Sequence, residues 1–305
     1  IVQKLQAMVN GNQEIRDDES RLFNIMATPG YPELIGEMIS LNNDRGLSAF
    51  IIGDSPMRLT PDATSLQNWA TNVNLAVEDN DNGLVSTDEY LGVFYPSGFT
   101  SDNFGNNVVV PASHMMLRTI ALSDQVSFPW FAPAGTRRGG ITNATSTGYI
   151  SNEGEFVSTS LNEGQRDTLY SNNVNPITFI TGAGLVNYGQ KTRFAGSSAL
   201  DRINVARLVI YLRSQLNKLA RPYVFEPNDK ITRDEIKAQA ESLLLELVGN
   251  RAIFDFLVVC DESNNTSTRI DRNELYLDIA IEPVKAVEFI YVPLRLKNTG
   301  EIAGL

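Results

Sequence analysis

The fold class is decided by residues 21–53, RLFNIMATPGYPELIGEMISLNNDRGLSAFIIG. The apolar runs at 21–27 and 47–53 have the length of strands, and residues 31–43 between them repeat apolar side chains at helical spacing. A strand, a helix and a second strand in this order form a βαβ unit, whose two strands are parallel. The stretch therefore predicts an α/β domain built on a parallel sheet.

The same pattern continues beyond this unit, with a helix predicted over 63–77 and a strand over 90–95. Residues 97–175 are rich in Gly, Ser, Asn and Thr, which indicates loop-rich cover or a contact surface. Two strands, two helices and three terminal strands follow. We place a boundary near residue 165, so that residues 1–165 form an α/β domain and residues 166–305 an α+β domain with a mixed sheet and two helices.

The end of the chain carries the clearest strand pattern. Residues 253–260, 269–281 and 287–296 each predict a strand, and apolar and polar side chains alternate strictly in the second. The third contains Pro293, which cannot donate to a strand ladder and so indicates an edge strand. An apolar strand beside an open sheet edge either aggregates or pairs with a designated neighbour.

Composition restricts the class of protein. The chain has 305 residues, of which 42% are apolar, enough for real cores. A formal net charge of −11 disfavours a nucleic-acid binder, which needs a basic surface. We find no signal peptide and no apolar run of membrane-spanning length, and the single Cys260 suits a reducing compartment. Because the sequence begins at Ile1 rather than Met, we expect it to be a fragment of a longer protein.

One predicted helix is basic in this acidic chain. No acidic residue occurs between Asp201 and Glu226. At 100° per residue, the apolar side chains of this helix take one side and the basic ones the other. The five basic residues are Arg202, Arg207, Arg213, Lys218 and Arg221. Either they form a docking face for an acidic protein partner, or they are solvated and paired with carboxylates elsewhere in the chain.

Candidate catalytic groups do not converge. His114 is the only histidine, which excludes a multi-histidine metal site, and no G-x-S-x-G motif is present. An apolar strand raises the pKa of a thiol, so Cys260 is a poor nucleophile. Gly182 and Gly184 lack the third glycine of a dinucleotide fingerprint and indicate a turn. We therefore expect no catalytic residue, no cofactor and no enzymatic activity.

Residues 78–89 imitate a calcium loop. Oxygen side chains stand at loop positions 1, 3, 5 and 12, occupied by Glu78, Asn80, Asn82 and Glu89. Position 1 is Glu rather than Asp, however, and a strand follows instead of the exiting helix of a calcium site. We interpret the segment as a polar helix-to-strand loop and expect no metal.

Several segments together resemble the contractile tail sheath proteins of myovirus-type bacteriophages. In chain order they are FNIMATPG, AFIIGDSP, YLGVFYPSG, VVPASHMM with FPWFAPAGTRRGG, NPITFITGAGLVNYGQKT, LDRINVARLVIYLRSQL, VVCDESNN and IDRNELYLDIAIEPVKAVEFIYV. Their colinearity over residues 22–296 makes the resemblance specific. The family usually has a longer N-terminal part with outer domains and an N-terminal arm, to which nothing here corresponds.

The resemblance implies a non-enzymatic, structural subunit of a virion tail. Such subunits stack as hexameric rings around a tail tube, and the sheath contracts to drive the tube through the host envelope. The implied partners are identical subunits, the tail tube protein, and the baseplate and tail terminator proteins, with assembly in the host cytoplasm and neither nucleic-acid binding nor membrane insertion. Alternatives are the sheath of a related contractile machine, such as a bacteriocin or a secretion or injection system, and, more remotely, an α/β enzyme.

The resemblance also assigns parts of the chain. Residues 1–165 correspond to a middle or outer sheath domain, and residues 166–305 to an inner, tube-facing domain with a terminal arm. The basic residues Arg202, Arg207, Arg213, Lys218 and Arg221 become candidates for contact with the tube. In such sheaths, terminal arms add strands to neighbouring subunits, which makes Val287, Phe289, Tyr291, Leu294 and Leu296 the candidates for an inter-subunit strand.

Overall fold

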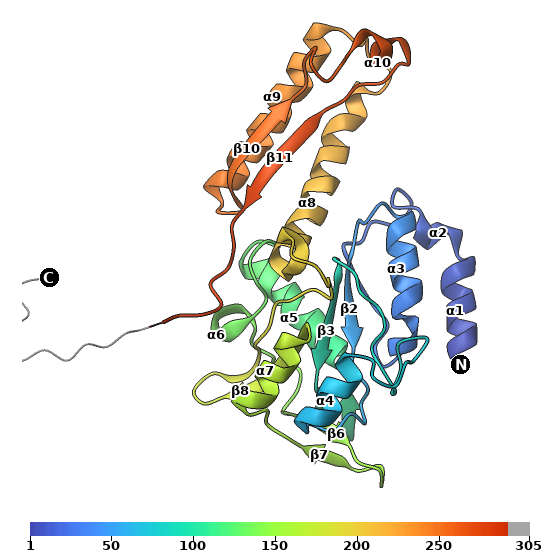
Figure 1. Ribbon diagram of the computed structural model, residues 1–305, viewed down its shortest axis with the longest axis vertical. Helices are drawn as coiled ribbons and strands as arrows, with labels where there is room; N and C mark the ends of the chain where they lie inside the picture. Colours follow the sequence, from blue (N-terminus) through green and yellow to red (C-terminus); the bar gives the residue numbers. More distant parts are fainter. Residues whose placement is uncertain (292–305) are drawn as a thin grey trace, which may run out of the picture.

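A five-stranded sheet forms the centre of the computed structural model, which describes residues 1–291 (Figure 1). Its order is β1-β2-β3-β8-β9, and the first four strands run parallel while β9 is antiparallel to β8. The strands are β1 (Ile25–Ala27), β2 (Phe50–Asp54), β3 (Leu91–Tyr95), β8 (Val174–Ile180) and β9 (Gly184–Asn187). The predicted βαβ unit and the mixed α/β class are confirmed.

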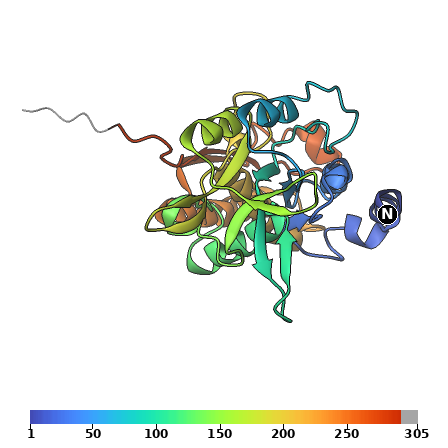
Figure 2. The same ribbon diagram turned by 90° about the horizontal axis from the view of Figure 1, so that it is seen from below.

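Helices cover both faces of this sheet (Figure 2). Side chains alternate along β2, so that Ile51 joins one core cluster while Phe50 and Ile52 join the other. The helices of the first face are α3 (Ile35–Asp44), α4 (Ala63–Ala70) and α7 (Glu163–Ser171), and those of the second are α5 (Ala112–Val126) and the start of α8 (Ile203–Ala220). Burial on both faces explains why the strands read as continuous apolar runs.

A second, antiparallel sheet lies where we expected loop-rich cover. Its order is β5-β4-β6-β7, from β4 (Ser97–Ser101), β5 (Asn107–Val110), β6 (Ser146–Ile150) and β7 (Phe156–Ser158). Small polar residues hide these strands from pattern analysis. Two features hold these strands together instead. The backbones of β6 and β7 approach closely at Gly148, where a Cβ would lie 2.1 Å from the carbonyl oxygen of Val157. The rings of Phe99 and Phe156 stack across the sheet.

Short elements complete the region before α8. They are α1 (Val2–Gly11), α2 (Gln13–Arg16), the 3-10 turns η1 (Pro32–Leu34) and η2 (Ala199–Asp201), and α6 (Gly135–Arg138). Both α1 and α2 pack against α3. Within residues 1–291, no helix combines the length and apolar character that crossing a membrane requires.

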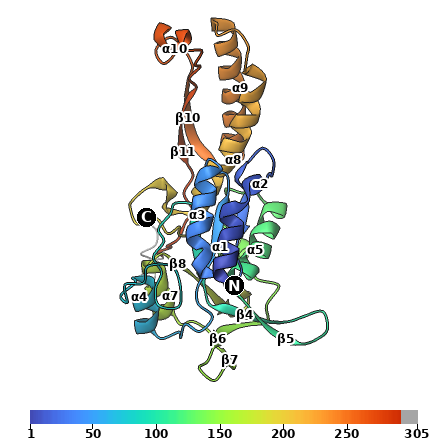
Figure 3. The same cartoon turned by 90° about the vertical axis from the view of Figure 1, so that its right-hand side faces the viewer.

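The remaining elements form a lobe that projects from the region of the central sheet (Figures 1 and 3). They are α8, the turn η3 (Arg221–Tyr223), α9 (Lys230–Gly249), β10 (Ile253–Val259), α10 (Ser267–Asp271) and β11 (Asp278–Pro283). Helix α8 belongs to two cores: Ala206 and Ile210 pack under the central sheet, while Leu208 and Leu212 pack in the lobe. One continuous helix therefore joins the two parts.

The central sheet does not follow the predicted boundary near residue 165, because β8 and β9 lie after that position and β8 pairs with β3. We propose residue 203, where α8 begins, as the division. Residues 1–202 are called the body and residues 203–283 the lobe. The lobe contains a two-stranded antiparallel sheet, and the mixed character of the central sheet comes from β8 and β9, which lie within the predicted range 166–305 but pair with the body.

The structure agrees to different degrees with the three predicted terminal strands. The first is confirmed as β10. The second begins later than predicted, because residues 267–271 form α10, but its alternation is confirmed: Leu277, Ile279 and Ile281 pack against the lobe core. The third is wrong over residues 287–291, which pair with no strand, and its remainder, with Leu294 and Leu296, lies outside the described residues.

Candidate functional site

The sheet of the lobe is incomplete at its edges. Strands β10 and β11 pair antiparallel from Ile253–Pro283 to Val259–Asp278, with one irregularity near Asp255. In the described part of the chain this sheet has two strands, so each keeps one edge without a strand neighbour. Phe254 and Leu257 on β10 are 68% and 62% exposed. The lobe thus presents strand edges beside apolar side chains, the arrangement to which another strand adds.

Residues 284–291, called the exit segment, leave β11 and pair with no strand. The backbone N–H of Val284 donates to the carbonyl of Ala252, which ties the start of the segment to the lobe. Farther along, four apolar side chains stand between 68% and 88% exposed: Val287, Phe289, Ile290 and Tyr291. Consecutive exposed apolar side chains mark an interaction site, because water is an unfavourable environment for them.

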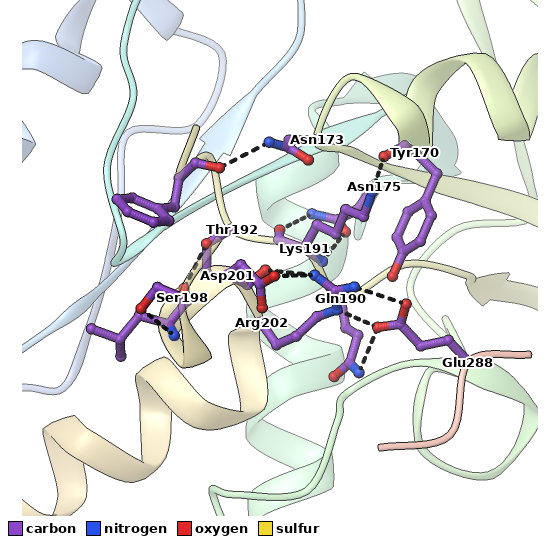
Figure 4. Close-up of polar contacts among 12 residues, drawn as sticks. Tyr170, Asn173, Asn175, Gln190, Lys191, Thr192, Ser198, Asp201, Arg202 and Glu288 are labelled. Carbon is purple, nitrogen blue, oxygen red and sulfur yellow. Dashed lines mark hydrogen bonds and ion pairs between the residues drawn. The ribbon is translucent and has the colours of Figure 1, made fainter. Parts of the chain in front are cut away.

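A single carboxylate anchors the exit segment to the body. Glu288 accepts hydrogen bonds from Arg202, with Nε to Oε1 at 2.5 Å and Nη2 to Oε2 at 3.2 Å, and from Nε2 of Gln190 at 3.1 Å (Figure 4). The Glu288 side chain is 15% exposed. These three residues are called the Glu288 clasp. A paired, bidentate carboxylate of this kind fixes direction as well as position.

The clasp rests on a network of polar groups (Figure 4). Arg202 also pairs with Asp201 at 3.0 Å, and Lys191 donates from Nζ to the carbonyl of Tyr170 at 2.8 Å. Burial, and then the charge of Glu288, raises the pKa of the Tyr170 hydroxyl. Burial, reinforced by Arg202, lowers the pKa of Lys191. The exit segment is therefore held where it meets the body, and its apolar end begins beyond this anchor.

The basic residues of α8 do not form an open stripe, which corrects the first interpretation. Arg207 is 3% exposed and binds Asp124 through both carboxylate oxygens, at 3.0 and 2.5 Å. Arg213 donates to the carbonyl of Leu47, and Arg221 pairs with Glu19 at the surface. The start of α8 is buried on both sides, so its charges must be paired. Most of the five basic residues instead pair with groups of the same chain, which was the second of the two interpretations.

Lys218 differs from the other four. It lies exposed near the end of α8, and no ion pair involves it within residues 1–291. Contact with a tube stays a prediction for the whole set. Of the five, Lys218 and Arg221 are exposed, Arg202 and Arg213 are partly buried, and Arg207 is buried.

The family of the chain follows from comparison with known proteins. Residues 196–297 match the family model of the phage tail sheath C-terminal domain, a range that contains the lobe and the exit segment. The tail sheath protein of Vibrio phage KVP40 is 35% identical over 249 residues, and that of Enterobacteria phage T4 is 32% identical over the same length. The chain is a relative of phage tail sheath proteins. Both alignments cover 79% of this chain, which spans about a third of the length of these relatives, 35% of each.

Solved structures show that this sheath relative has the fold of contractile assemblies. A chain from the baseplate of the anti-feeding prophage superposes with a TM-score of 0.71 at 18% identity, covering 92% of this chain and 70% of that one. A chain from the contracted helical sheath of the same prophage gives 0.67 at 18% identity, covering 90% and 70%. At such identities the likeness concerns the fold alone.

The calcium-like loop of the sheath relative is organised by a different residue. Asp79, at loop position 2, accepts from the backbone N–H groups of Val85 and Ser86 at 2.6 and 2.9 Å and is 4% exposed. Asn80 forms a bridge with Gly83. The loop is thus closed by its own side chain, and among residues 1–291 no three His, Cys, Asp or Glu residues group as metal ligands.

The carboxyl group of Asp54 occupies the carboxyl end of β2. Asp54 accepts from the backbone N–H groups of Gly30 and Ser113, at 2.9 and 2.6 Å, and from Oγ of Ser113. Burial raises the pKa of Asp54, although these hydrogen bonds oppose the change. In α/β enzymes this edge binds ligands. Here its N–H groups are already used, so the enzyme alternative gains no support from this edge.

The other groups considered for catalysis lie apart from one another. Cys260 is buried, and burial raises its pKa, as the strand context predicts. His114 lies exposed on α5. Gly182 and Gly184 form the turn between β8 and β9 with positive φ angles of 86° and 80°.

The Glu288 clasp is not directly predictable from the sequence. Glu288 and Gln190 are 98 positions apart, and a helical wheel of α8 shows Arg202 only as one of five basic residues. One signal was present: Glu288 is the single acidic residue within the apolar run 287–296. A lone charge in a predicted strand indicates a specific partner.

Proposed function

We propose that this chain is a structural subunit of a contractile tail sheath, which stacks as rings around a tail tube and shortens to drive the tube through a host envelope. The observation that carries the proposal is the exit segment. Its apolar side chains stand exposed next to Glu288, three of them beyond the clasp, and the β10–β11 sheet keeps two edges to which a strand could add. In this proposal, the exit segment of one subunit adds a strand to the lobe of another.

Strand addition of this kind suits a polymer. Each backbone hydrogen bond contributes about 0.5–1.5 kcal/mol net, while ordering each residue costs roughly 1–2 kcal/mol of conformational free energy. A single short strand therefore gives a weak link. When each subunit makes several links, the later ones are effectively intramolecular and the lattice becomes stable. The clasp supports this arrangement because it fixes the point from which each linking segment starts.

The proposed partners are identical subunits, a tail tube protein, and baseplate and tail terminator proteins, with the assembled protein in a virion tail after assembly in the host cytoplasm. Lys218 and Arg221 are the best placed of the basic candidates for tube contact, because both are exposed. A sheath of a related contractile machine is a second candidate, favoured by the fold shared with chains of the anti-feeding prophage. We propose no catalytic activity, nucleic-acid binding or membrane insertion.

Electron microscopy of negatively stained protein tests the proposal. We expect hollow, striated tubes from the unmodified protein, and loss of tubes in the double variant Phe289→Asp with Ile290→Asp, because charges prevent burial of the added strand. The matched control is Val77→Asp, which changes an apolar side chain that is 93% exposed in a loop of the body. The control should assemble normally.

Two results would contradict the proposal. One is the persistence of small monodisperse particles of the unmodified protein under assembly conditions. The other is equal tube formation by the double variant and the unmodified protein, which would show that the exit segment does not link subunits.

A further inference from the structure

The four-stranded sheet of the body ends in two strands that have no outer neighbour within residues 1–291. Strand β5 pairs with β4 alone, and β7 pairs with β6 alone. In Figure 3 the β4–β5 hairpin projects from the lower part of the body, away from the helices. Proteins usually protect such edges with charged side chains or proline. Residues 107–110 and 156–158 contain neither, so both edges are open to another strand.

The outer edge of β5 presents backbone hydrogen-bonding groups to its surroundings. The N–H of Asp102 donates to the carbonyl of Asn106 at 2.9 Å, so the backbone groups of Asn106 face β4. Along a strand, the backbone groups of successive residues point to opposite sides. The N–H and C=O groups of Asn107 and Val109 therefore point outward, away from β4.

The outer edge of β7 is arranged in the same way. The N–H of Thr159 donates to the carbonyl of Thr147 at 2.8 Å, so the backbone groups of Thr159 face β6. By the same alternation, the N–H and C=O groups of Phe156 and Ser158 point outward. Each border of the sheet thus offers two residues whose donors and acceptors are placed to pair with a further strand.

The hairpin that carries β5 is ordered by its own contacts. Oδ1 of Asp102 accepts from the backbone N–H groups of Phe104 and Asn106, both at 2.8 Å, and so fixes the loop between the strands. A segment that is already ordered loses less conformational entropy when it binds. Strand β5 is therefore preformed for pairing.

One face of the sheet carries an apolar row that reaches both borders. Val109 on β5 lies directly opposite Phe99 on β4, and the Phe99 ring stacks on Phe156 of β7 at 4.8 Å between ring centres. All three side chains are only half-buried. An aromatic or β-branched side chain on a neighbouring strand would cover the ends of this row, since such cross-strand pairs stabilise sheets.

The two borders match each other in direction. Successive strands in the order β5-β4-β6-β7 are antiparallel, so β5 and β7 also run in opposite directions. A second copy in the same orientation therefore brings its β5 antiparallel to β7. In the register that sets Phe156 opposite Val109 and Ser158 opposite Asn107, the outward groups meet and the side chains share one face. These two pairs would exchange about four hydrogen bonds.

A single copy cannot join its own two borders. They are separated by three strand spacings of about 4.8 Å, or roughly 14 Å. The occupant of each border must come from another molecule, and every copy of this chain carries the matching strand. Contacts between two different surfaces of identical molecules produce rings or helical arrays.

We propose that β7 of one subunit pairs antiparallel with β5 of a second copy of this chain, so that the four-stranded sheet continues from body to body. The inference rests on the proposed sheath function, and the contact is distinct from strand addition by the exit segment to the lobe. Because the paired strands are short, one contact is weak, and the contacts hold when many copies are joined at once.

Disulfide trapping of the full chain tests the contact. The double variant Asn107→Cys with Ser158→Cys places thiols on directly opposite residues of the proposed pair, about 5.5 Å apart between Cα atoms, which suits a disulfide. With oxidised glutathione, we expect a ladder of dimers, trimers and larger species on a non-reducing gel. A mixture of the two single variants should stop at dimers. The native Cys260 is buried and should not contribute.

The matched control is Asn107→Cys with Glu153→Cys. Glu153 is exposed in the turn between β6 and β7, and in the proposed register it lies roughly 16 Å along the strand from Asn107 of the second copy. Cross-linking in the control should be about tenfold slower or more, because no pairing holds its thiols together. Thermal unfolding of the reduced variants should match that of the unmodified chain, since Asn107 and Ser158 are exposed.

The outcomes separate this contact from the proposed function. A ladder in the double variant that the control lacks supports the contact, whether or not tubes form. Tubes in which the double variant cross-links no faster than the control overturn the contact and leave the sheath function standing. Equal cross-linking without tubes counts against both. Dimers from Asn107→Cys alone, formed as fast as the ladder, would show that β5 pairs with β5 and would overturn the head-to-tail arrangement.

Discussion

The sheet of the body and the sheet of the lobe differ in how much of their apolar surface the chain itself covers. The body sheet has five strands, and helices bury both of its faces. The lobe sheet has two strands, exposes Phe254 and Leu257, and continues into a segment of exposed apolar side chains. The chain covers both faces of the body sheet, whereas the lobe sheet keeps exposed apolar side chains and edges without a strand neighbour within residues 1–291. The proposed function therefore assigns stability mainly to the body and assembly mainly to the lobe.

The largest expected effect is a loss of stability when a buried side chain of the body sheet is truncated. Phe94 is fully buried in β3, so Phe94→Ala should lower the free energy of unfolding by about 3–5 kcal/mol. Leu257→Ala, on the exposed side of β10, should change it by less than about 0.5 kcal/mol. Urea denaturation of the isolated chain measures both. Comparable losses in the two variants would show that the lobe surface is not free in the isolated chain.

The next effect concerns charges on α8. Arg207→Ala leaves Asp124 without its partner, and because Asp124 is partly exposed we expect a loss of about 2–4 kcal/mol. Lys218→Ala, on the same helix, should cost less than about 0.5 kcal/mol. Thermal unfolding compares the pair. If Arg207→Ala proves as stable as the unmodified chain, the buried ion pair does not stabilise the protein. Tests of tube contact should accordingly use Lys218 and Arg221, since variants of Arg207 change the stability of the fold.

The smallest expected effect concerns the Glu288 clasp, where the exit segment meets the body. Glu288→Gln keeps the shape of the side chain but removes its charge from the clasp, which should cost about 1–2 kcal/mol of local stability. The global unfolding transition should hardly move, while proteolytic cleavage within residues 284–291 should accelerate severalfold. The neighbouring Glu282→Gln, at an exposed position of β11, serves as the control. An unchanged cleavage rate in Glu288→Gln would mean that the clasp does not hold the segment.

The parts of the fold that sequence reasoning found are those stabilised by apolar burial. The runs at 21–27 and 47–53 predicted a parallel sheet because both faces of the strands are covered. The second sheet of the body escaped notice, because its strands are short and polar and their stability comes from pairing rather than from composition. The apolar run that begins at Val287 predicted a strand, but a strand needs a neighbour, and within 287–291 the single chain supplies none.

The candidate site was predictable only in outline. The apolar end of the chain indicated a linking segment, and the described part of it is exposed as that role requires. A helical wheel placed Arg207 on an outer face because it describes one helix and cannot show that α5 lies against that side with Asp124. The clasp joins residues about 90 positions apart, and a single sequence carries no information on such contacts beyond the isolated charge of Glu288.

Helix α8 has a mechanical consequence. Its 18 residues extend about 27 Å at 1.5 Å per residue, and its side chains are buried in two separate cores. An unbroken helix resists bending, so a force applied to the lobe is transmitted along α8 and acts as torque on the central sheet. The body and the lobe should turn as one lever, with the hinge of any larger movement placed after β11, in the segment that Glu288 secures.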